Sequence, residues 1–307
     1  MSNYHIIPDI HGQADKLDSI LDRLGWRRTI SGWAGPTPES RLVFLGDFID
    51  GGAHNARVIQ TVRSLIDSGK ADAVMGNHEF NAICYHTISN KTGEPLREHS
   101  EKNRKQHQSF LAEFSLSAPE TTEAVDWMKT LPLFREYETF RVVHACWFHP
   151  DVALVQEQLP GTRVNDEALQ NANLKHSKLW DAVQTLTSGI EKVLPEGYSF
   201  ADKYEHERHQ VRIGWWLHNA KTWRDTAQSV PNPEDLPMDT LPPSVADYLY
   251  KDEKPVFFGH YWMTGKPRIE APHALCLDYS AGKNGPLVAY DLAGTDKELS
   301  ANRIVIP

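Results

Sequence analysis

The first 75 residues alternate between short apolar runs and segments with helical periodicity, and no other feature constrains the fold as strongly. Apolar runs typical of buried strands occupy residues 4–7, 41–45 and 71–75. Between them, residues 15–24 and 53–67 place apolar side chains three and four positions apart, as on one face of a helix. This alternation predicts a layered α/β fold, in which helices cover a sheet.

The rest of the chain predicts further strands on both sides of a long polar insertion. Residues 79–131 have helical character, and their charged stretch 97–108 is expected to be the solvated face of a helix. Strand character returns at residues 140–144, just before the insertion. After the insertion, four segments are typical of strands: 255–259, 274–278, 286–292 and 303–306.

The insertion divides the expected core into two stretches of sequence. Residues 1–150 and 250–307 are predicted to form the core, and residues 151–249 an inserted, mostly helical cap. Because the strands on either side of the insertion both end at histidines, we expect the cap to cover that edge of the sheet. The insertion contains Trp215, Trp216 and Trp223. These rings could stack on a nucleobase, but we expect them to pack the cap onto the core.

Composition argues against two classes of partner. The formal net charge of −9 opposes binding to nucleic acid or to an anionic membrane. No apolar run reaches the roughly 18 residues that a membrane-spanning helix needs, and Pro8 and Asp9 interrupt any N-terminal signal segment. The cysteines form no close pair, which suits a reducing compartment. We therefore expect a cytoplasmic protein that binds neither nucleic acid nor membrane.

Ligand-type side chains follow five of the expected strands at the points where the strands end. They are Asp9, His11, Asp47, Asp50, Asn77, His78, Glu79, His144 and His260. Because ligands bind at the carboxyl ends of strands in such sheets, we expect these side chains to converge on one edge. Asp, Asn and His are hard or borderline ligands, which suit magnesium, manganese, iron or zinc. No cysteine is placed to join them, so a thiolate site is not expected. The sequence therefore predicts a metal cage assembled from dispersed loops.

The order of these residues strongly resembles the motifs of the calcineurin-like metallophosphoesterases. The corresponding segments read DIH, GDFID, GNHE, VVHAC and GHYW, in the family's order. The resemblance implies a β-sandwich of two mixed sheets flanked by helices, and the activity of a metal-dependent phosphoesterase. It is closest to the branch of protein phosphatases and symmetrical diadenosine tetraphosphatases, because Trp262 stands where many other members have a further histidine.

The resemblance also implies two divalent metal ions and their ligands. The implied ligands are Asp9 and His11 for the first ion, Asp47 for both ions, and Asn77, His144 and His260 for the second ion. Manganese is the expected metal, with iron, zinc, magnesium and nickel as alternatives. Two ions about 3.5–4 Å apart generate a nucleophilic bridging hydroxide and stabilise the phosphoryl group that it attacks. The expected reaction is hydrolysis of a phosphate ester or phosphoanhydride.

His78 and Asp50 are the candidate catalytic pair. The leaving group needs a proton, and an imidazole has the pKa range that suits a general acid. His78 lies beside the implied ligand Asn77, and Asp50 could orient the His78 ring. The alternative is that His78 is a metal ligand or a structural histidine. Glu79 is expected to support the ligands rather than to take part in the chemistry.

One departure from the branch leaves the substrate phosphate without its usual cation. The branch reads G-D-x-x-D-R-G, and its arginine clamps the phosphate, whereas this chain has Gly51 at that position. Arg212, Lys221 and Arg224 in the insertion are candidate substitutes, although each could equally be an ordinary surface cation.

The sequence therefore predicts an enzyme whose substrate is a phosphorylated small molecule, a nucleotide or a phosphoprotein. It does not decide between a serine/threonine phosphoprotein phosphatase and a dinucleoside polyphosphate hydrolase. The arginine missing at position 51 leaves a second class of function open, a non-catalytic or weakly active regulator that binds metal or phosphate.

Overall fold

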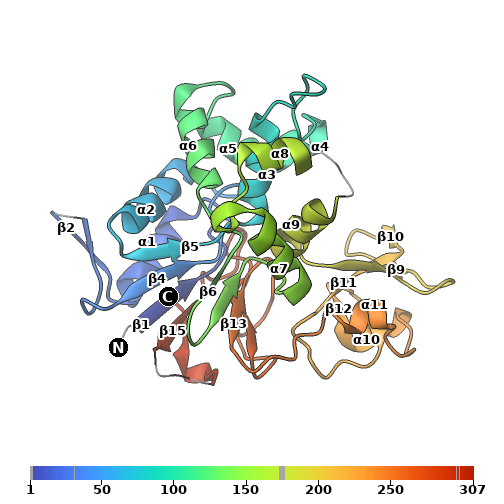
Figure 1. Ribbon diagram of the computed structural model, residues 1–307. Helices are drawn as coiled ribbons and strands as arrows, with labels where there is room; N and C mark the ends of the chain where they lie inside the picture. Colours follow the sequence, from blue (N-terminus) through green and yellow to red (C-terminus); the bar gives the residue numbers. More distant parts are fainter. Residues whose placement is uncertain (1–2, 31, 173–176, 295, 297) are drawn as a thin grey trace.

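Two mixed β-sheets form the core of the computed structural model, which describes every residue except 1–2, 31, 173–176, 295 and 297 (Figure 1). The first sheet has the strand order β16-β15-β1-β4-β5. Its strands are β1 (Asn3–Ile7), β4 (Arg41–Phe44), β5 (Ala71–Ala73), β15 (Ala289–Ala293) and β16 (Ile304–Val305). β1, β4 and β5 pair in parallel, whereas β15 pairs with both β1 and β16 in the antiparallel sense.

The second sheet has the strand order β14-β13-β7-β6. Its strands are β6 (Phe134–Glu136), β7 (Arg141–Val143), β13 (Val256–Phe258) and β14 (Ala274–Cys276). β7, β13 and β14 pair in parallel, and β6 pairs with β7 in the antiparallel sense. Both sheets therefore mix the two kinds of pairing, and the predicted α/β fold of mixed sheets flanked by helices is confirmed.

Two neighbouring residues of β1 show why its sequence is a continuous apolar run. Ile6 lies in a buried cluster with Val142 and Phe257 of the second sheet, whereas Ile7 lies in a cluster with Leu17 of a flanking helix. Successive side chains of a strand point to opposite faces of the sheet. One face of this sheet is thus covered by the second sheet and the other by helices, so both faces select apolar residues.

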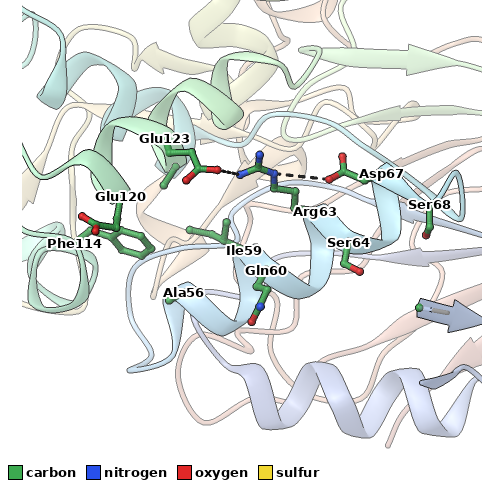
Figure 2. Close-up of a pocket in the computed structure, with 12 residues that line it drawn as sticks. Ala56, Ile59, Gln60, Arg63, Ser64, Asp67, Ser68, Phe114, Glu120 and Glu123 are labelled. Carbon is green, nitrogen blue, oxygen red and sulfur yellow. Dashed lines mark hydrogen bonds and ion pairs between the residues drawn. The ribbon is translucent and has the colours of Figure 1, made fainter. Parts of the chain in front are cut away.

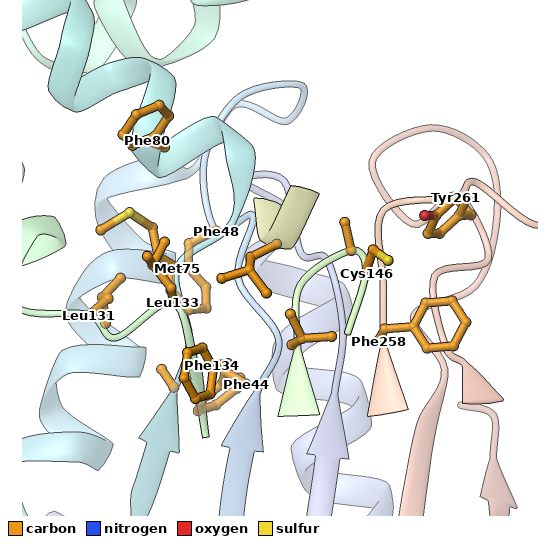
Figure 3. Close-up of a cluster of buried hydrophobic side chains, with 14 of the residues drawn as sticks. Phe44, Phe48, Met75, Phe80, Leu131, Leu133, Phe134, Cys146, Phe258 and Tyr261 are labelled. Carbon is orange, nitrogen blue, oxygen red and sulfur yellow. The ribbon is translucent and has the colours of Figure 1, made fainter. Parts of the chain in front are cut away.

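The flanking helices of the first sheet form where the sequence has helical periodicity. They begin with α1 (Ala14–Arg23), whose Leu17, Ile20 and Leu21 are buried, and α2 (Asn55–Asp67). The helices that follow β5 are α3 (Asn77–His86), α4 (Glu101–Gln106), α5 (Gln108–Glu113) and α6 (Pro119–Lys129). Figure 3 shows part of the buried cluster that contains Ile7, with Phe44, Phe48 and Met75 in or just after strands of the first sheet and Phe134 and Phe258 in strands of the second. β2 (Arg27–Thr29) and β3 (Gly32–Ala34) form a separate hairpin.

The insertion between β7 and β13 is helical in its first part and contains strands in its second. Its helices are α7 (His149–Gln158), the 3-10 turn η1 (Pro160–Thr162), α8 (Asp166–Ala172) and α9 (Lys178–Ser188). Its later elements are β8 (Glu191–Val193), β9 (Phe200–Ala201), β10 (Glu207–Arg208), β11 (Gln210–Ile213), α10 (Trp223–Thr226), β12 (Ala227–Gln228), η2 (Pro233–Asp235) and α11 (Pro243–Ala246). The insertion is thus helical as far as α9. After α9 it consists of short strands with two short helices and a 3-10 turn, unlike the mostly helical segment that was predicted.

The strand signal in the second part of the insertion is short. In β11, Val211 and Ile213 are buried while the residues beside them are not, which is the two-residue alternation of a strand. β11 pairs with β8 and β12 in a three-stranded sheet, and β9 pairs with β10. Strands of two to four residues carry too few alternations to stand out in a polar sequence. The 3-10 turn η3 (Ala301–Arg303) precedes β16.

The tryptophans of the insertion pack inward, as expected. Trp215, Trp216 and Trp223 are at most 4% exposed. The indole nitrogen Nε1 of Trp215 donates a hydrogen bond of 2.9 Å to the carbonyl oxygen of Ala145, which lies directly after His144 in the core. Among the described residues, no helix is both long and apolar enough to cross a membrane.

Candidate metal centre

The predicted ligands converge at the edge of the sandwich where five strands end. Asp9 and His11 follow β1, Asp47 and Asp50 follow β4, and Asn77 and His78 begin the helix that follows β5. His144 directly follows β7, and His260 lies two residues after β13. The side chains of the predicted ligands and of Asp50 and His78 are buried, except that Asn77 is half-buried. Five short loops thus deliver a polar cluster into the apolar interior.

The backbone of these loops is unusual. Ten described residues other than glycine have positive φ, and six of them lie at this edge: His11, Asp47, Asp50, His260, Trp262 and Ser280. Such conformations cost of order 1–3 kcal/mol each and persist only where the surroundings enforce them. Strained backbone conformations are therefore concentrated in the loops that position the predicted ligands.

Two overlapping groups of side chains could each hold a metal ion. One consists of His11, Asp47 and His78, and the other of Asp47, His144 and His260, with the ligand atoms of each group within 4.8 Å of one another. Asp47 is common to both. Its Oδ2 atom lies 3.6 Å from Nε2 of His11 and 3.4 Å from Nε2 of His144. A carboxylate in this position can serve two ions at once.

The imidazole rings are oriented to offer lone pairs to this cluster. Nδ1 of His11 donates to the carbonyl oxygen of Ile49 at 3.1 Å, and Nδ1 of His144 donates to that of Leu45 at 2.7 Å. A proton on Nδ1 leaves Nε2 as the ligand atom. Nε2 of His11 and Nε2 of His260 are buried without a hydrogen-bond partner. Orphaned buried nitrogens are rare, and a bound cation beside Asp47 would satisfy Nε2 of His11, so this residue fits an implied metal ion.

Asn77 and Asp9 complete the cluster from two further loops. Oδ1 of Asn77 lies 2.9 Å from Nδ1 of His260 and 3.1 Å from Nε2 of His144, so all three converge. Asp9 is fully buried, and its carboxylate accepts the backbone N–H of His260 at 3.0 Å. Its Oδ1 lies 3.9 Å from Nε2 of His144. The backbone of Gly259 makes room for this carboxylate, because a Cβ atom there would lie 1.9 Å from Oδ2 of Asp9.

Glu79 ties two of the loops together, as expected. Its buried carboxylate accepts the backbone N–H groups of Asp47 and Phe48, each at 2.8 Å, and that of Gly76 at 3.0 Å. Both of its oxygens are thus used to hold the turn after β4 against the start of α3. Burial raises the pKa of Glu79 to about 7, with the charge of Asp47 adding to the effect.

Asp50 contacts His78 and a second histidine that the sequence did not indicate. Its Oδ2 lies 2.7 Å from Nδ1 of His78, and its Oδ1 lies 2.9 Å from Nδ1 of His107. His107 lies in the stretch expected to be solvated, but it is buried, so that expectation was wrong for this residue. It stands between α4 and α5, where its ring turns inward, and its Nε2 lies 3.2 Å from Nε2 of His86.

The buried charges of the cluster perturb one another's pKa values. Burial works to raise the pKa of Asp47, but the charges of His144 and His78 outweigh it and hold that pKa well below its usual range. Burial works to lower the pKa of His78, but the charge of Asp47 and the hydrogen bond with Asp50 raise it to about 9. Burial also works to lower the pKa of His144, but the charge of Asp47 and its hydrogen bond with His144 raise that pKa to about 10. Since ligands must be deprotonated, cation binding here is coupled to proton release.

A pocket of about 200 Å³ opens onto the cluster. The residues that line it are His11, Asp50, Gly51, His78, Gln106, Trp262, Asp278, Ser280, Gly282 and Lys283. Four of these come from residues 278–283, after β14, a segment in which the sequence indicated no site residue. Asp278 is buried, and its carboxylate accepts the backbone N–H groups of Trp262 at 2.7 Å and Ser280 at 2.8 Å.

The three candidate substrate cations lie in different surroundings. Arg212 in β11 lies over the ring of Tyr261 at 5.7 Å and is close enough to His260 to add to the lowering of its pKa, which burial dominates. Arg224 forms a salt bridge of 2.8 Å with Glu234. None of the three candidates lines the pocket. Arg212 is therefore the member of this set that lies near the predicted ligands.

A larger and more open hollow, of about 720 Å³, lies between α2 and α6 (Figure 2). Its most prominent charged group is Arg63, which pairs with Glu123 at 2.9 Å and with Asp67 at 3.8 Å. None of the predicted ligands lines it. The smaller pocket at the strand ends is therefore the candidate site.

A sandwich of mixed sheets that gathers Asp, Asn and His side chains at the ends of five strands is the arrangement that the resemblance to the calcineurin-like metallophosphoesterases implied. The chain belongs to the calcineurin-like phosphoesterase family, whose sequence profile matches residues 3–261. The matched span contains every predicted metal ligand from Asp9 to His260.

Curated relatives of the chain include several bis(5′-nucleosyl)-tetraphosphatases. The symmetrical enzyme of Psychromonas ingrahamii is 27% identical over 143 residues, which are 46% of this chain and 43% of that protein. The symmetrical enzyme of Vibrio campbellii is 23% identical over 274 residues, 84% of each chain. The match to the first of these relatives thus spans less than half of its length.

Solved structures show the same fold. A putative diadenosine tetraphosphatase has a TM-score of 0.50 at 18% identity, and the match covers 100% of this chain and 93% of that one. A protein serine/threonine phosphatase from Saccharomyces cerevisiae has a TM-score of 0.51 at 12% identity, covering 100% of this chain and 79% of that one. At these identities the likeness establishes architecture only.

The close approach of Gly259 to Asp9 yields a test of the cluster. We expect Gly259→Ala to lower the metal content of the protein, because the added methyl group would overlap the Asp9 carboxylate and displace it. Metal per chain, measured after loading with manganese and gel filtration, checks this. Gly93→Ala is the control for backbone strain alone: Gly93 has a positive φ of 71°, but a Cβ atom there meets nothing within 4 Å, so it displaces no side chain. Full metal content in Gly259→Ala would show that metal binding does not depend on the position of Asp9.

Proposed function

We propose that the chain is a dinuclear metal-dependent phosphoesterase, with Asp9, His11, Asp47, Asn77, His144 and His260 as its metal ligands. The observation that carries the proposal is the position of Asp47, which belongs to both groups that could hold an ion. The unpartnered Nε2 atom of His11 and the convergence of His260 and His144 on Oδ1 of Asn77 support it further. Membership in the calcineurin-like phosphoesterase family favours the same chemistry. Manganese remains the metal to test first, and the cytoplasm remains the expected compartment.

The metal ions, when bound, would activate a water molecule and neutralise charge on the phosphoryl group. The chain's own residues then have separate tasks. Asp47 holds both ion positions, and the neutral amide of Asn77 adds an oxygen ligand without adding negative charge near an anionic substrate. His78 lines the pocket beside Asp50 and is placed to give a proton to the leaving oxygen. Asp50 is a positioning residue, because it acts by fixing the His78 ring.

A nucleotide or another small phosphorylated molecule is the substrate class that we propose. The relatives are named as bis(5′-nucleosyl)-tetraphosphatases, and a pocket of about 200 Å³ can accept a phosphoryl group with part of its leaving group. We also propose that residues 151–249 act as a cap that selects substrates, because β11 of this segment brings Arg212 close to His260.

A substrate panel separates enzyme from regulator. We would incubate the manganese-loaded protein with p-nitrophenyl phosphate, its bis ester, diadenosine tetraphosphate and a phosphoserine peptide. Hydrolysis of diadenosine tetraphosphate above the level of an Asp47→Ala variant supports the proposal. Phosphate binding without turnover of any substrate would identify a regulator instead.

The bridging role of Asp47 predicts a specific loss of metal. We expect Asp47→Ala to lose both ions, because the substitution removes the one carboxylate that both groups share. Metal analysis of the purified, manganese-loaded variant measures this. Asp72→Ala is a matched control, since Asp72 is a half-buried carboxylate of β5 that binds Tyr137 and Arg135 away from the cluster. Two ions per chain in Asp47→Ala would contradict the assignment.

The roles of His78 and Asp50 predict a dependence on the leaving group. We expect His78→Ala to lower turnover of alkyl phosphates by roughly two to four orders of magnitude, the usual worth of a general acid. The loss should be smaller with p-nitrophenyl phosphate, because nitrophenolate leaves without a proton. Asp50→Asn should show the same trend in weaker form. Equal losses on both substrates would exclude His78 as the acid, and loss of metal would make it a ligand.

A further inference from the structure

The wall of the pocket beside Gly51 carries a cation and an aromatic ring in contact. Nζ of Lys283 lies 3.7 Å from the ring centroid of Trp262, and both residues line the pocket together with His11 and His78. Trp262 is 42% exposed and is the tryptophan among the exposed large hydrophobic residues, whereas the other described tryptophans are buried or partly buried. It also has a positive φ of 51°, so the backbone accepts strain to present this ring at the pocket.

The ammonium group of Lys283 has no anionic partner among the described residues. No carboxylate lies within ion-pair distance of it, whereas Arg224 and Arg63 in the same protein are both paired. The nearby acid is Asp278, whose two oxygens already accept backbone N–H groups. Partial burial and the charge of Lys203 lower the pKa of Lys283. A bound anion would give this unpaired cation an opposite charge.

Hydrogen bonds fix the backbone of the loop at residues 281–285, which carries Lys283. The ammonium of Lys16 in α1 donates to three carbonyl oxygens of the loop, those of Ala281 at 2.7 Å, Lys283 at 3.1 Å and Gly285 at 2.9 Å. Lys16 thus fixes the main chain of Lys283, and the side chain of Lys283 contacts the ring of Trp262. A charged group held in this way is preorganised for a ligand.

The loop of Lys283 also adjoins the position of the missing arginine. A Cβ atom on Gly51 would lie 3.4 Å from the carbonyl oxygen of Gly282, the residue before Lys283. Gly51 and Lys283 line one pocket with Asp50 and His78. A side chain at position 51 would therefore enter the same space that the Lys283 ammonium borders.

We propose that Lys283 is the phosphate-binding cation of this protein, held at the pocket by Trp262, and that it replaces the arginine absent at position 51. This proposal rests on the proposed function, since it assigns a substrate contact at the same site. An ammonium is a point charge on a flexible stem, whereas a guanidinium grips two oxygens in a fixed fork. The Trp262 ring compensates by restricting where the stem can place its charge, through a cation–π contact.

Inorganic phosphate and p-nitrophenyl phosphate are the probes for the test. In the manganese-loaded protein, we expect Lys283→Met to weaken phosphate binding and lower kcat/KM by roughly 10- to 100-fold, the range for a hydrogen bond to a charged group. Calorimetric titration with phosphate measures binding, and initial rates measure kcat/KM. Lys283→Arg should retain most of both, because it keeps the charge. Lys91→Met, which removes an exposed lysine that does not line the pocket, should change neither.

Trp262 is a positioning residue in this proposal, and a double variant tests that role. Trp262→Ala should weaken phosphate binding by less than Lys283→Met does, and Trp262→Phe should restore it because an aromatic face remains. The pair Lys283→Met with Trp262→Ala should bind phosphate no more weakly than Lys283→Met alone, since the ring acts through the ammonium. Additive losses would show that the ring acts independently of Lys283.

The outcomes separate this proposal from the proposed function. Unchanged phosphate affinity and unchanged kcat/KM in Lys283→Met, with the wild type active, would overturn only the assignment of Lys283. Loss of bound metal in Lys283→Met would overturn it as well, by showing a structural effect. A wild type that hydrolyses no phosphoester would refute the proposed function, while calorimetry with phosphate would still decide whether Lys283 binds the anion.

Discussion

The carboxylate of Asp47 is the group on which the rest of the site depends. Oδ1 accepts the backbone N–H of His78 at 2.9 Å, and Oδ2 faces the Nε2 atoms of His11 and His144. Its backbone is held by Glu79, which accepts the N–H of Asp47 and so joins the loop after β4 to α3. Because one buried anion organises both the histidines and the start of α3, its removal should disturb the whole cluster rather than one ligand.

The neighbourhood of Asp50 shows how the catalytic pair is built from parts that are far apart in the chain. Asp50 reaches His78 with one oxygen and His107 with the other, so the carboxylate cannot rotate away from either ring without losing a hydrogen bond. Asn55 accepts the backbone N–H of Asp50 at 2.8 Å and fixes its main chain. His78, His107 and Asn55 at the start of α2 therefore fix the position of the Asp50 carboxylate. A proton donor beside a substrate needs a partner that is held in place in this way.

The sequence predicted the strand ends of the site because strand, glycine and ligand follow one another within a few residues there. Asp47, Asn77 and His260 could be located in this way, after Gly46, Gly76 and Gly259. Residues that reach the site from elsewhere had no such signal. His107 stands at the junction of two short helices, in a stretch dense with charges, and only the three-dimensional structure shows that its ring turns inward. The short strands of the insertion were missed because tertiary pairing, and not local pattern, creates them.

Lys283 was missed for a different reason, since its role depends on how closely two loops approach. Gly282 allows that approach: a Cβ atom on this residue would lie 2.7 Å from Cδ2 of His11, so any side chain there would push the loop away from the cluster. Gly51 on the facing loop has a positive φ of 89°, a conformation that an arginine would adopt only with strain. The glycine at position 51 and the glycine before Lys283 are therefore two parts of one arrangement. The first leaves the pocket open where the branch places its arginine, and the second brings a lysine from the opposite side to border the same space.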